Sequence, residues 1–198
     1  MMVSRLFAES HATTDSNFAE VTDWVHYADL FPGEQLAATV GRVPHASVPE
    51  PYQRLLVHNQ HMTGMMERFY QSSVDVRVLA RRIDGSVYSR KIILATQDTG
   101  TVVQFAFMQF QLDAVSEAVR GQILSEQLPL GRVLVNHGMR CDIELSSLLK
   151  VTIGDALSKH LNVPAGIVTY GRIAQILSDG KPLCAVIEVL APIKLVAS

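Results

Sequence analysis

The sequence predicts an α+β protein in which helices pack on a single antiparallel sheet of about six strands. The first sign is a strict alternation of apolar and polar side chains over residues 74–83, which sends them to opposite faces of a strand. The second sign is a set of turn sequences, Asp84-Gly85, Asp98-Thr99-Gly100 and Asp179-Gly180, each between two strand-like runs. Short turns of this kind connect antiparallel strands, so the neighbouring runs are expected to pair as hairpins.

The strands are expected where β-branched and aromatic residues concentrate, because these residues favour extended structure. In chain order the runs are residues 74–83, 87–96, 101–112, 140–151, 167–178 and 182–191. The last run is apolar on both of its faces apart from Glu188. A strand with this pattern is expected to be covered on both sides.

Helices are expected before and between these strands. From Tyr52 to Tyr70 apolar residues recur at intervals of three and four, and Gly64 is expected to divide this stretch into two helices. Ser116 is suited to cap a helix within residues 113–137. Two further short helices are predicted from their spacing, at residues 18–30 and 153–162.

The chain of 198 residues is expected to form one domain with an appendage. Residues 1–48 are the least regular part, with a polar start and several prolines and glycines that favour turns. We therefore predict an N-terminal extension at residues 1–48, draped over a domain formed by residues 49–198.

Composition argues against several classes of function. The net charge is −2 and only 18% of the residues are charged, so the basic surface typical of a nucleic-acid-binding protein is not expected. No long apolar stretch and no apolar leader are visible, which predicts a cytoplasmic protein without membrane attachment. Cys141 and Cys184 lie far apart outside any metal-binding or redox motif, and we expect two reduced cysteines.

Two ionisable residues stand out because they lie on core-facing positions of predicted strands. Alternation places Arg90 on the same face as Tyr88 and Ile92, while Lys91 points to the other face. Glu188 is the lone carboxylate in the last, apolar strand. A buried charge is costly unless it is paired, so each residue is expected either to form a structural salt bridge or to contact a ligand. Together they would suit a small, anionic, hydroxylated ligand.

His58 and His61 have a spacing that would bring both side chains to one face of a helix. A metal site normally needs further ligands at recognisable offsets, and none is present here. We therefore predict no metal site, and read these residues as ordinary polar or capping histidines at a helix break.

Several short motifs, taken in order, resemble the chorismate pyruvate-lyase (4-hydroxybenzoate synthase) family. The similarity covers about residues 52–192 and leaves the first 48 residues unmatched. The residues that carry it are His61-Met62-Thr63, Glu67-Arg68-Phe69, Ser89-Arg90-Lys91-Ile92-Ile93-Leu94, Pro129-Leu130-Gly131-Arg132-Val133-Leu134, Asp179-Gly180-Lys181-Pro182-Leu183 and Ile187-Glu188-Val189-Leu190-Ala191-Pro192.

This resemblance implies a fold, an activity and a site. The fold would be chorismate lyase-like, with a small buried pocket. The activity would be cofactor-free conversion of chorismate to 4-hydroxybenzoate and pyruvate in a biosynthetic pathway. Arg90 would hold the ring carboxylate and Glu188 would face the ring hydroxyl, and both would be catalytic. The main chain at Met62 and Leu130 would also bind substrate, and the helices around Met62 would act as flaps. Neither a metal nor an organic cofactor is implied.

Two alternatives remain open at the level of sequence. The residues before Met62 and the strand after residue 101 depart from the family pattern, so the chain would suit a lyase or cyclase for another small aromatic or cyclic acid. The second alternative is a non-catalytic, effector-sensing domain, because the ligand-binding domains of one group of bacterial repressors resemble the same fold. Residues 1–48 show no recognition-helix pattern that would accompany such a domain. We expect a monomer or a homodimer.

Overall fold

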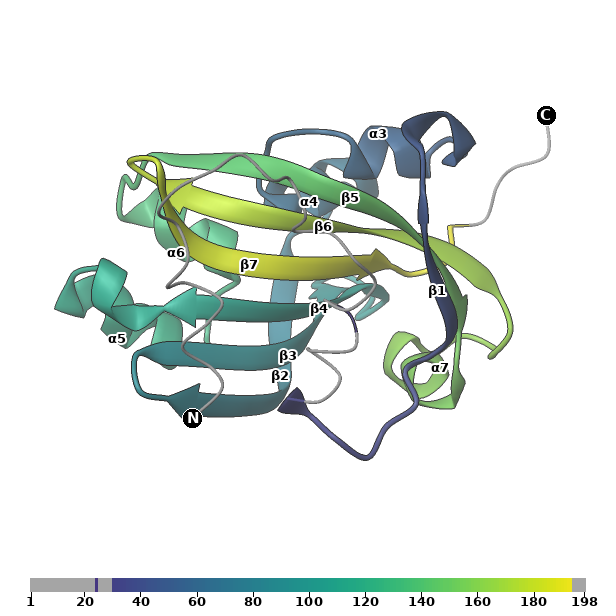
Figure 1. The fold of residues 1–198 in the computed structure, drawn as a ribbon, viewed down its shortest axis with the longest axis horizontal. Coiled ribbons are helices and arrows are strands. Elements are labelled where there is room, and N and C mark those ends of the chain that lie inside the picture. The colour runs from purple at the N-terminus through teal and green to yellow at the C-terminus, as the bar shows by residue number, and fades with distance from the viewer. Residues whose placement is uncertain (1–23, 25–29, 194–198) are drawn as a thin grey trace, which may run out of the picture.

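The computed structural model describes Trp24 and residues 30–193 of the chain. These residues form an α+β fold around a single antiparallel sheet, as predicted, but with seven strands instead of about six. The additional strand is β1, which pairs with β5 at one edge and comes from the segment before residue 48 (Figure 1). The strand order across the sheet is β1-β5-β6-β7-β4-β3-β2.

The six predicted strands are all present, with ends within a few residues of those expected. Asp179 and Gly180 have φ angles of 51° and 73°, so the last hairpin turns through the left-handed conformation that an Asp-Gly pair favours. The strands are β1 (Ala37–Val43), β2 (Val74–Asp84), β3 (Val87–Thr96), β4 (Val102–Gln111), β5 (Cys141–Ile153), β6 (Val168–Ser178) and β7 (Lys181–Leu190).

The helices are short and lie between the strands in the sequence. Ser116 caps its helix as predicted, because its side chain accepts a hydrogen bond from the N–H of Val119. The helices are α3 (Tyr52–Leu56), α4 (Met62–Tyr70), α5 (Glu117–Leu124), α6 (Leu130–Asn136) and α7 (Asp155–Leu161), with 3-10 turns η1 (His45–Ser47) and η2 (Leu112–Ala114). None of the helices in the part of the chain that the structure describes is long and apolar enough to cross a membrane.

The break between α3 and α4 does not fall at Gly64, which lies in the first turn of α4. It falls at residues 57–61, which we call the connector. Gly64 was the wrong choice because a single glycine costs a helix only about 1 kcal/mol. The predicted helix at residues 18–30 lies almost entirely outside the described residues.

Helices cover both faces of the sheet. Along β4, Phe105 and Phe107 pack against α7, while Ala106 and Met108 pack against the other helices. We call the second side, which carries Ala106 and Met108, the cavity face, and the side that carries Phe105 and Phe107 the α7 face. Figure 1 shows α5 and α6 at one end of the sheet and α7 towards the other.

Arg90 lies on the cavity face, as alternation predicted, with an exposed fraction of 1%. Lys91 is also buried, but on the α7 face, where its ammonium group forms an ion pair with Glu34. His160 contacts the same carboxylate at 3.1 Å. Both neighbouring cations are therefore buried, because the sheet is covered on both of its sides.

Candidate functional site

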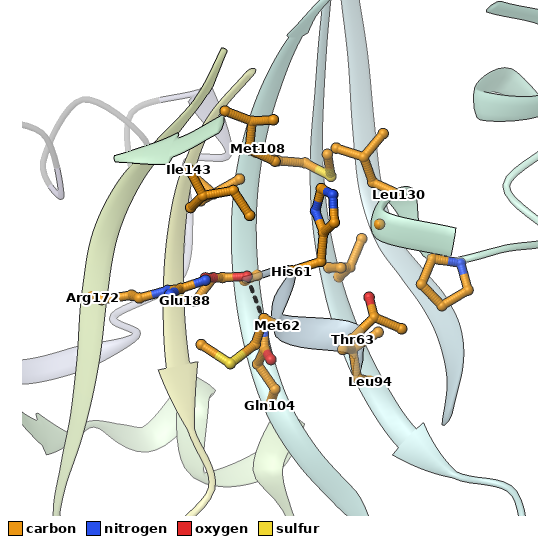
Figure 2. A pocket seen from close by; sticks show the side chains of 16 residues that line it. His61, Met62, Thr63, Leu94, Gln104, Met108, Leu130, Ile143, Arg172 and Glu188 are labelled. Atoms are coloured by element: carbon orange, nitrogen blue, oxygen red, sulfur yellow. Dashed lines mark hydrogen bonds and ion pairs between the residues drawn. The ribbon is translucent and has the colours of Figure 1, made fainter. Parts of the chain in front are cut away.

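A small cavity of about 50 Å³ lies between the cavity face of the sheet and the N-terminal ends of α4 and α6 (Figure 2). About 10–15 Å³ suffices for one water molecule, and typical ligand pockets measure about 300–1,000 Å³, so this cavity is much smaller than a typical ligand pocket. Its walls are mostly apolar with a few polar groups. The lining residues include His61, Met62, Thr63, Gln104, Met108, Leu130, Gly131, Arg172, Val186 and Glu188.

The polar side of the cavity is built around Glu188 on β7. The β6–β7 register places Arg172 directly opposite, and its Nε donates to Oε2 of Glu188 at 2.6 Å. The other carboxylate oxygen, Oε1, accepts a hydrogen bond of 3.3 Å from Nε2 of Gln104 on β4. Figure 2 shows Arg172, Glu188 and Gln104 next to one another along this side. The charge of Glu188 is therefore neutralised inside the protein.

Arg172 also holds the connector over the cavity. Its Nη1 donates to the carbonyl oxygen of His58 at 3.1 Å, and its Nη2 to that of Gln60 at 3.4 Å. The guanidinium has an exposed side-chain fraction of 2%, and it joins the sheet, the carboxylate and the connector. Displacing the connector would break these bonds.

His58 is fixed in one neutral form by its contacts. Its Nδ1 faces two donors, the N–H of Gln60 at 3.1 Å and Nη1 of Arg172 at 3.3 Å, so it must act as the acceptor. Nε2 then carries the proton and donates to the carbonyl of Leu55 at 2.8 Å. Burial, followed by the nearby charge of Arg172, lowers the pKa of His58. Burial likewise lowers the pKa of His61.

The two helices above the cavity meet closely at Gly131 in α6. A Cβ atom at this position would lie 3.0 Å from Cβ of His61 and 3.2 Å from Oγ1 of Thr63. Arg132 of α6 also forms an ion pair with Glu67 of α4. The glycine of the Pro129-Leu130-Gly131-Arg132 motif therefore has a structural role, because it allows α6 to contact the start of α4.

Arg90 is buried beside the cavity without lining it. Its Nε lies 2.9 Å from Sδ of Met108, and Met108 does line the cavity. Its guanidinium carbon lies 5.9 Å from the centre of the Tyr88 ring. Nη1 of Arg90 has no hydrogen-bond partner among the residues that the structure describes.

Tyr88 separates Arg90 from a surface ion pair. Its hydroxyl donates to Glu126 at 2.5 Å, and Glu126 also pairs with Arg81 at 3.0 Å. Burial raises the pKa of Tyr88 to about 12. The carboxylate of Glu126 is thus already engaged by two other groups.

The structure brings three of the four predicted site residues to one cavity. Met62, Leu130 and Glu188 all line it, and Arg90 lies behind Met108. The sequence reasoning missed Arg172 and Gln104. Arg172 carried a signal that could have found it, since it alternates with apolar residues inside a predicted strand as Glu188 does.

Among the described residues, no group of three or more metal-binding side chains comes together. Cys141 and Cys184 are both free, as predicted, and Cys184 is buried. The polar groups that line the cavity are the Arg172–Glu188 ion pair, the amide of Gln104, and the side chains of His61 and Thr63.

Comparison with known proteins identifies similarities of fold only. No family model and no curated protein matches the chain. The effector domain of PhnF from Mycobacterium smegmatis matches with a TM-score of 0.53 at 11% identity, covering 69% of this chain and 91% of that domain. A structure of PhnF from the same organism matches with a TM-score of 0.51 at 11% identity, and the match covers 68% of this chain and 65% of that one. A GntR-family transcriptional regulator from Enterococcus faecalis V583 matches with a TM-score of 0.44 at 11% identity, over 62% of this chain and 99% of that one.

The two matches to PhnF show a likeness of fold. With its seven-stranded antiparallel sheet and flanking helices, it has a chorismate lyase-like fold, and it shares that fold with the effector domain of PhnF. The likeness confirms the predicted fold and does not extend to the lyase family.

Proposed function

We propose that this chain is a small-molecule-binding domain that takes a small aromatic or cyclic carboxylic acid into the cavity below α4 and α6. The observation that carries the proposal is an imbalance of buried charge on the cavity face. Two arginines are buried there, Arg90 and Arg172, but Glu188 is the only buried carboxylate among the described residues. Because Glu188 neutralises Arg172, Arg90 is left with an unpaired donor.

A ligand carboxylate is the natural partner for this arginine. The planar guanidinium matches a carboxylate with two parallel hydrogen bonds, and an unpaired buried charge is costly. Met108 separates Arg90 from the cavity, and its flexible thioether can adopt other rotamers. The fold shared with the effector domain of PhnF supports a binding role that needs no chemistry.

Binding requires the cavity to enlarge, because about 50 Å³ holds only a few water molecules. The hydrogen bonds described between the connector and the sheet all come from one side chain, that of Arg172, which donates to the carbonyl groups of His58 and Gln60. We therefore place the entrance at the connector and the start of α4.

Titration calorimetry with 4-hydroxybenzoate tests the proposal through Arg90→Lys, which keeps the charge but loses the planar fork. Affinity should fall about tenfold or more, which corresponds to about 1.4 kcal/mol, while the melting temperature without ligand is retained. The control is Lys91→Arg, which replaces lysine by arginine on the α7 face. It should leave the affinity for 4-hydroxybenzoate unchanged. Equal affinity in Arg90→Lys and the wild type would remove Arg90 from the site.

The second candidate is an enzyme, a lyase that converts chorismate to 4-hydroxybenzoate and pyruvate or a related lyase or cyclase. It is favoured by the fact that Met62, Leu130 and Glu188, which the family resemblance assigns to substrate, line one cavity. It ranks second because Glu188 is engaged by Arg172 and is not a free base. Stoichiometric release of pyruvate from chorismate would establish the lyase, whereas binding without turnover would leave the first proposal.

A further inference from the structure

Gln104 presents an unpaired acceptor at the polar side of the cavity. Its side chain is buried, with an exposed fraction of 2%, and it lines the cavity. Nε2 donates to Glu188, but Oε1 has no hydrogen-bond partner among the described residues. A buried carbonyl oxygen without a partner is unfavourable, and in native proteins it usually has a reason.

The orientation of this amide follows from its neighbour. Arg172 holds Glu188 as a carboxylate, which can only accept hydrogen bonds. If the amide were turned over, its oxygen would face another acceptor at 3.3 Å. The NH₂ group must therefore point to Glu188, and the oxygen is left without a donor.

We propose that Gln104 determines ligand specificity, by accepting a hydrogen bond through Oε1 from a hydroxyl or amino group of the ligand. The inference rests on the proposed function and refines it. The ligand would be an acid with a hydrogen-bond donor at the end remote from its carboxylate. Gln104 pairs with Leu94 and Arg90 pairs with Met108 in the β3–β4 ladder, so the two residues lie four positions apart. At about 3.4 Å per residue, this is about 14 Å along the strands, and both side chains lie on the cavity face.

Gln109 provides a matched control in the same strand. Its Nε2 donates to Ser89 at 3.3 Å, and its Oε1 is likewise buried without a partner. It lies on the α7 face and does not line the cavity. The two glutamines thus share one chemistry, but of the two it is Gln104 that lines the cavity.

The experiment compares the affinities of 4-hydroxybenzoate, 4-aminobenzoate and benzoate for the wild type, Gln104→Met and Gln109→Met. Benzoate would leave Oε1 unpaired, so the wild type should prefer the two donor-bearing acids by about tenfold or more. Gln104→Met should bring the three affinities to within about threefold of one another. Gln109→Met should keep the preference of the wild type.

A preference that survives in Gln104→Met, or that is lost equally in Gln109→Met, would overturn the inference while leaving the proposed function in place. If none of the three acids binds the wild type, the proposed function fails, and this inference fails with it. If Gln104→Met does not fold, Gln104→Asn replaces it, because it keeps the amide but withdraws it by one methylene. Gln104→Asn should likewise lose the preference for the donor-bearing acids. A Gln104→Asn protein that keeps this preference would overturn the inference.

Discussion

At the scale of single residues, the pair formed by Arg172 and Glu188 is the best-defined feature of the site. The exposed side-chain fractions are 2% for Arg172 and 11% for Glu188, so neither charge is well hydrated. Breaking a buried pair by removing one charge leaves the other uncompensated, which typically costs about 3–5 kcal/mol. The pair therefore has a structural role in addition to any contact with a ligand.

We expect Glu188→Gln to lower the free energy of unfolding by about 3–5 kcal/mol, because Arg172 would lose its counter-ion. Urea denaturation measures this directly. The double variant Arg172→Met/Glu188→Leu is the control, since replacing both charges by apolar groups should restore much of the loss. A Glu188→Gln protein as stable as the wild type would show that the two charges are well solvated.

The sequence indicated Glu188 and Arg90 because a charged residue in an apolar, alternating strand is conspicuous on its own. It did not indicate which charge pairs with which, because pairs across strands depend on register. Arg172 meets Glu188 only through the alignment of β6 with β7. Gln104 is uncharged and diagonal to Glu188, so no sequence pattern marked it.

At the scale of elements, the packing of α6 on the start of α4 depends on Gly131. The nearest atoms to a Cβ there belong to His61, at 3.0 Å and 3.2 Å, and to Thr63 at 3.2 Å. The added methyl group would have to displace one helix from the other. Overpacking of this kind costs about 1–3 kcal/mol.

We therefore expect Gly131→Ala to lower the free energy of unfolding by about 1–3 kcal/mol and to weaken acid binding, because the roof of the cavity shifts. Gly121→Ala is the matched control in α5, where nothing lies within 4 Å of the new Cβ. There the substitution should stabilise the protein by about 0.5–1 kcal/mol, because alanine favours a helix over glycine. Changes of the same sign at both positions would contradict the close contact at Gly131.

At the scale of the whole molecule, six strands of the sheet were predictable, whereas β1 and the contact made by Glu34 were not. Hairpin turns and alternation indicated six of the seven strands, since both signals are local. β1 was missed because Ala37–Val43 is half exposed at the edge and pairs with β5, more than 100 residues later. A separation of 57 residues likewise hides the contact of Glu34 with Lys91, which places Glu34 against the α7 face.

Lowering the pH should reduce the free energy of unfolding, and the connector should be affected first. His58 accepts at Nδ1 from Gln60 and Arg172, so a proton on Nδ1 would face two donors. Burial lowers the pKa values of His58 and His61. The unfolded chain, with histidine pKa values of about 6.5, then binds more protons than the folded one as the pH falls. Stability is therefore fully present above about pH 6.5 and is lost below it, by at most about 1.4 kcal/mol per pH unit for each histidine.

Urea denaturation at a series of pH values from 8 to 5 measures this loss. His58→Gln removes one titrating group and should make the dependence on pH shallower, with the largest difference from the wild type below pH 6.5. His137→Gln is the control, because His137 is exposed just after the end of α6 and its ring forms a hydrogen bond with Gln122 at 2.7 Å. Hydrogen exchange of the connector amides should accelerate at low pH in the wild type, since the bonds from Arg172 to the carbonyls of His58 and Gln60 weaken together. A wild-type stability that stays constant from pH 8 to 5 would show that His58 is not held in its neutral form.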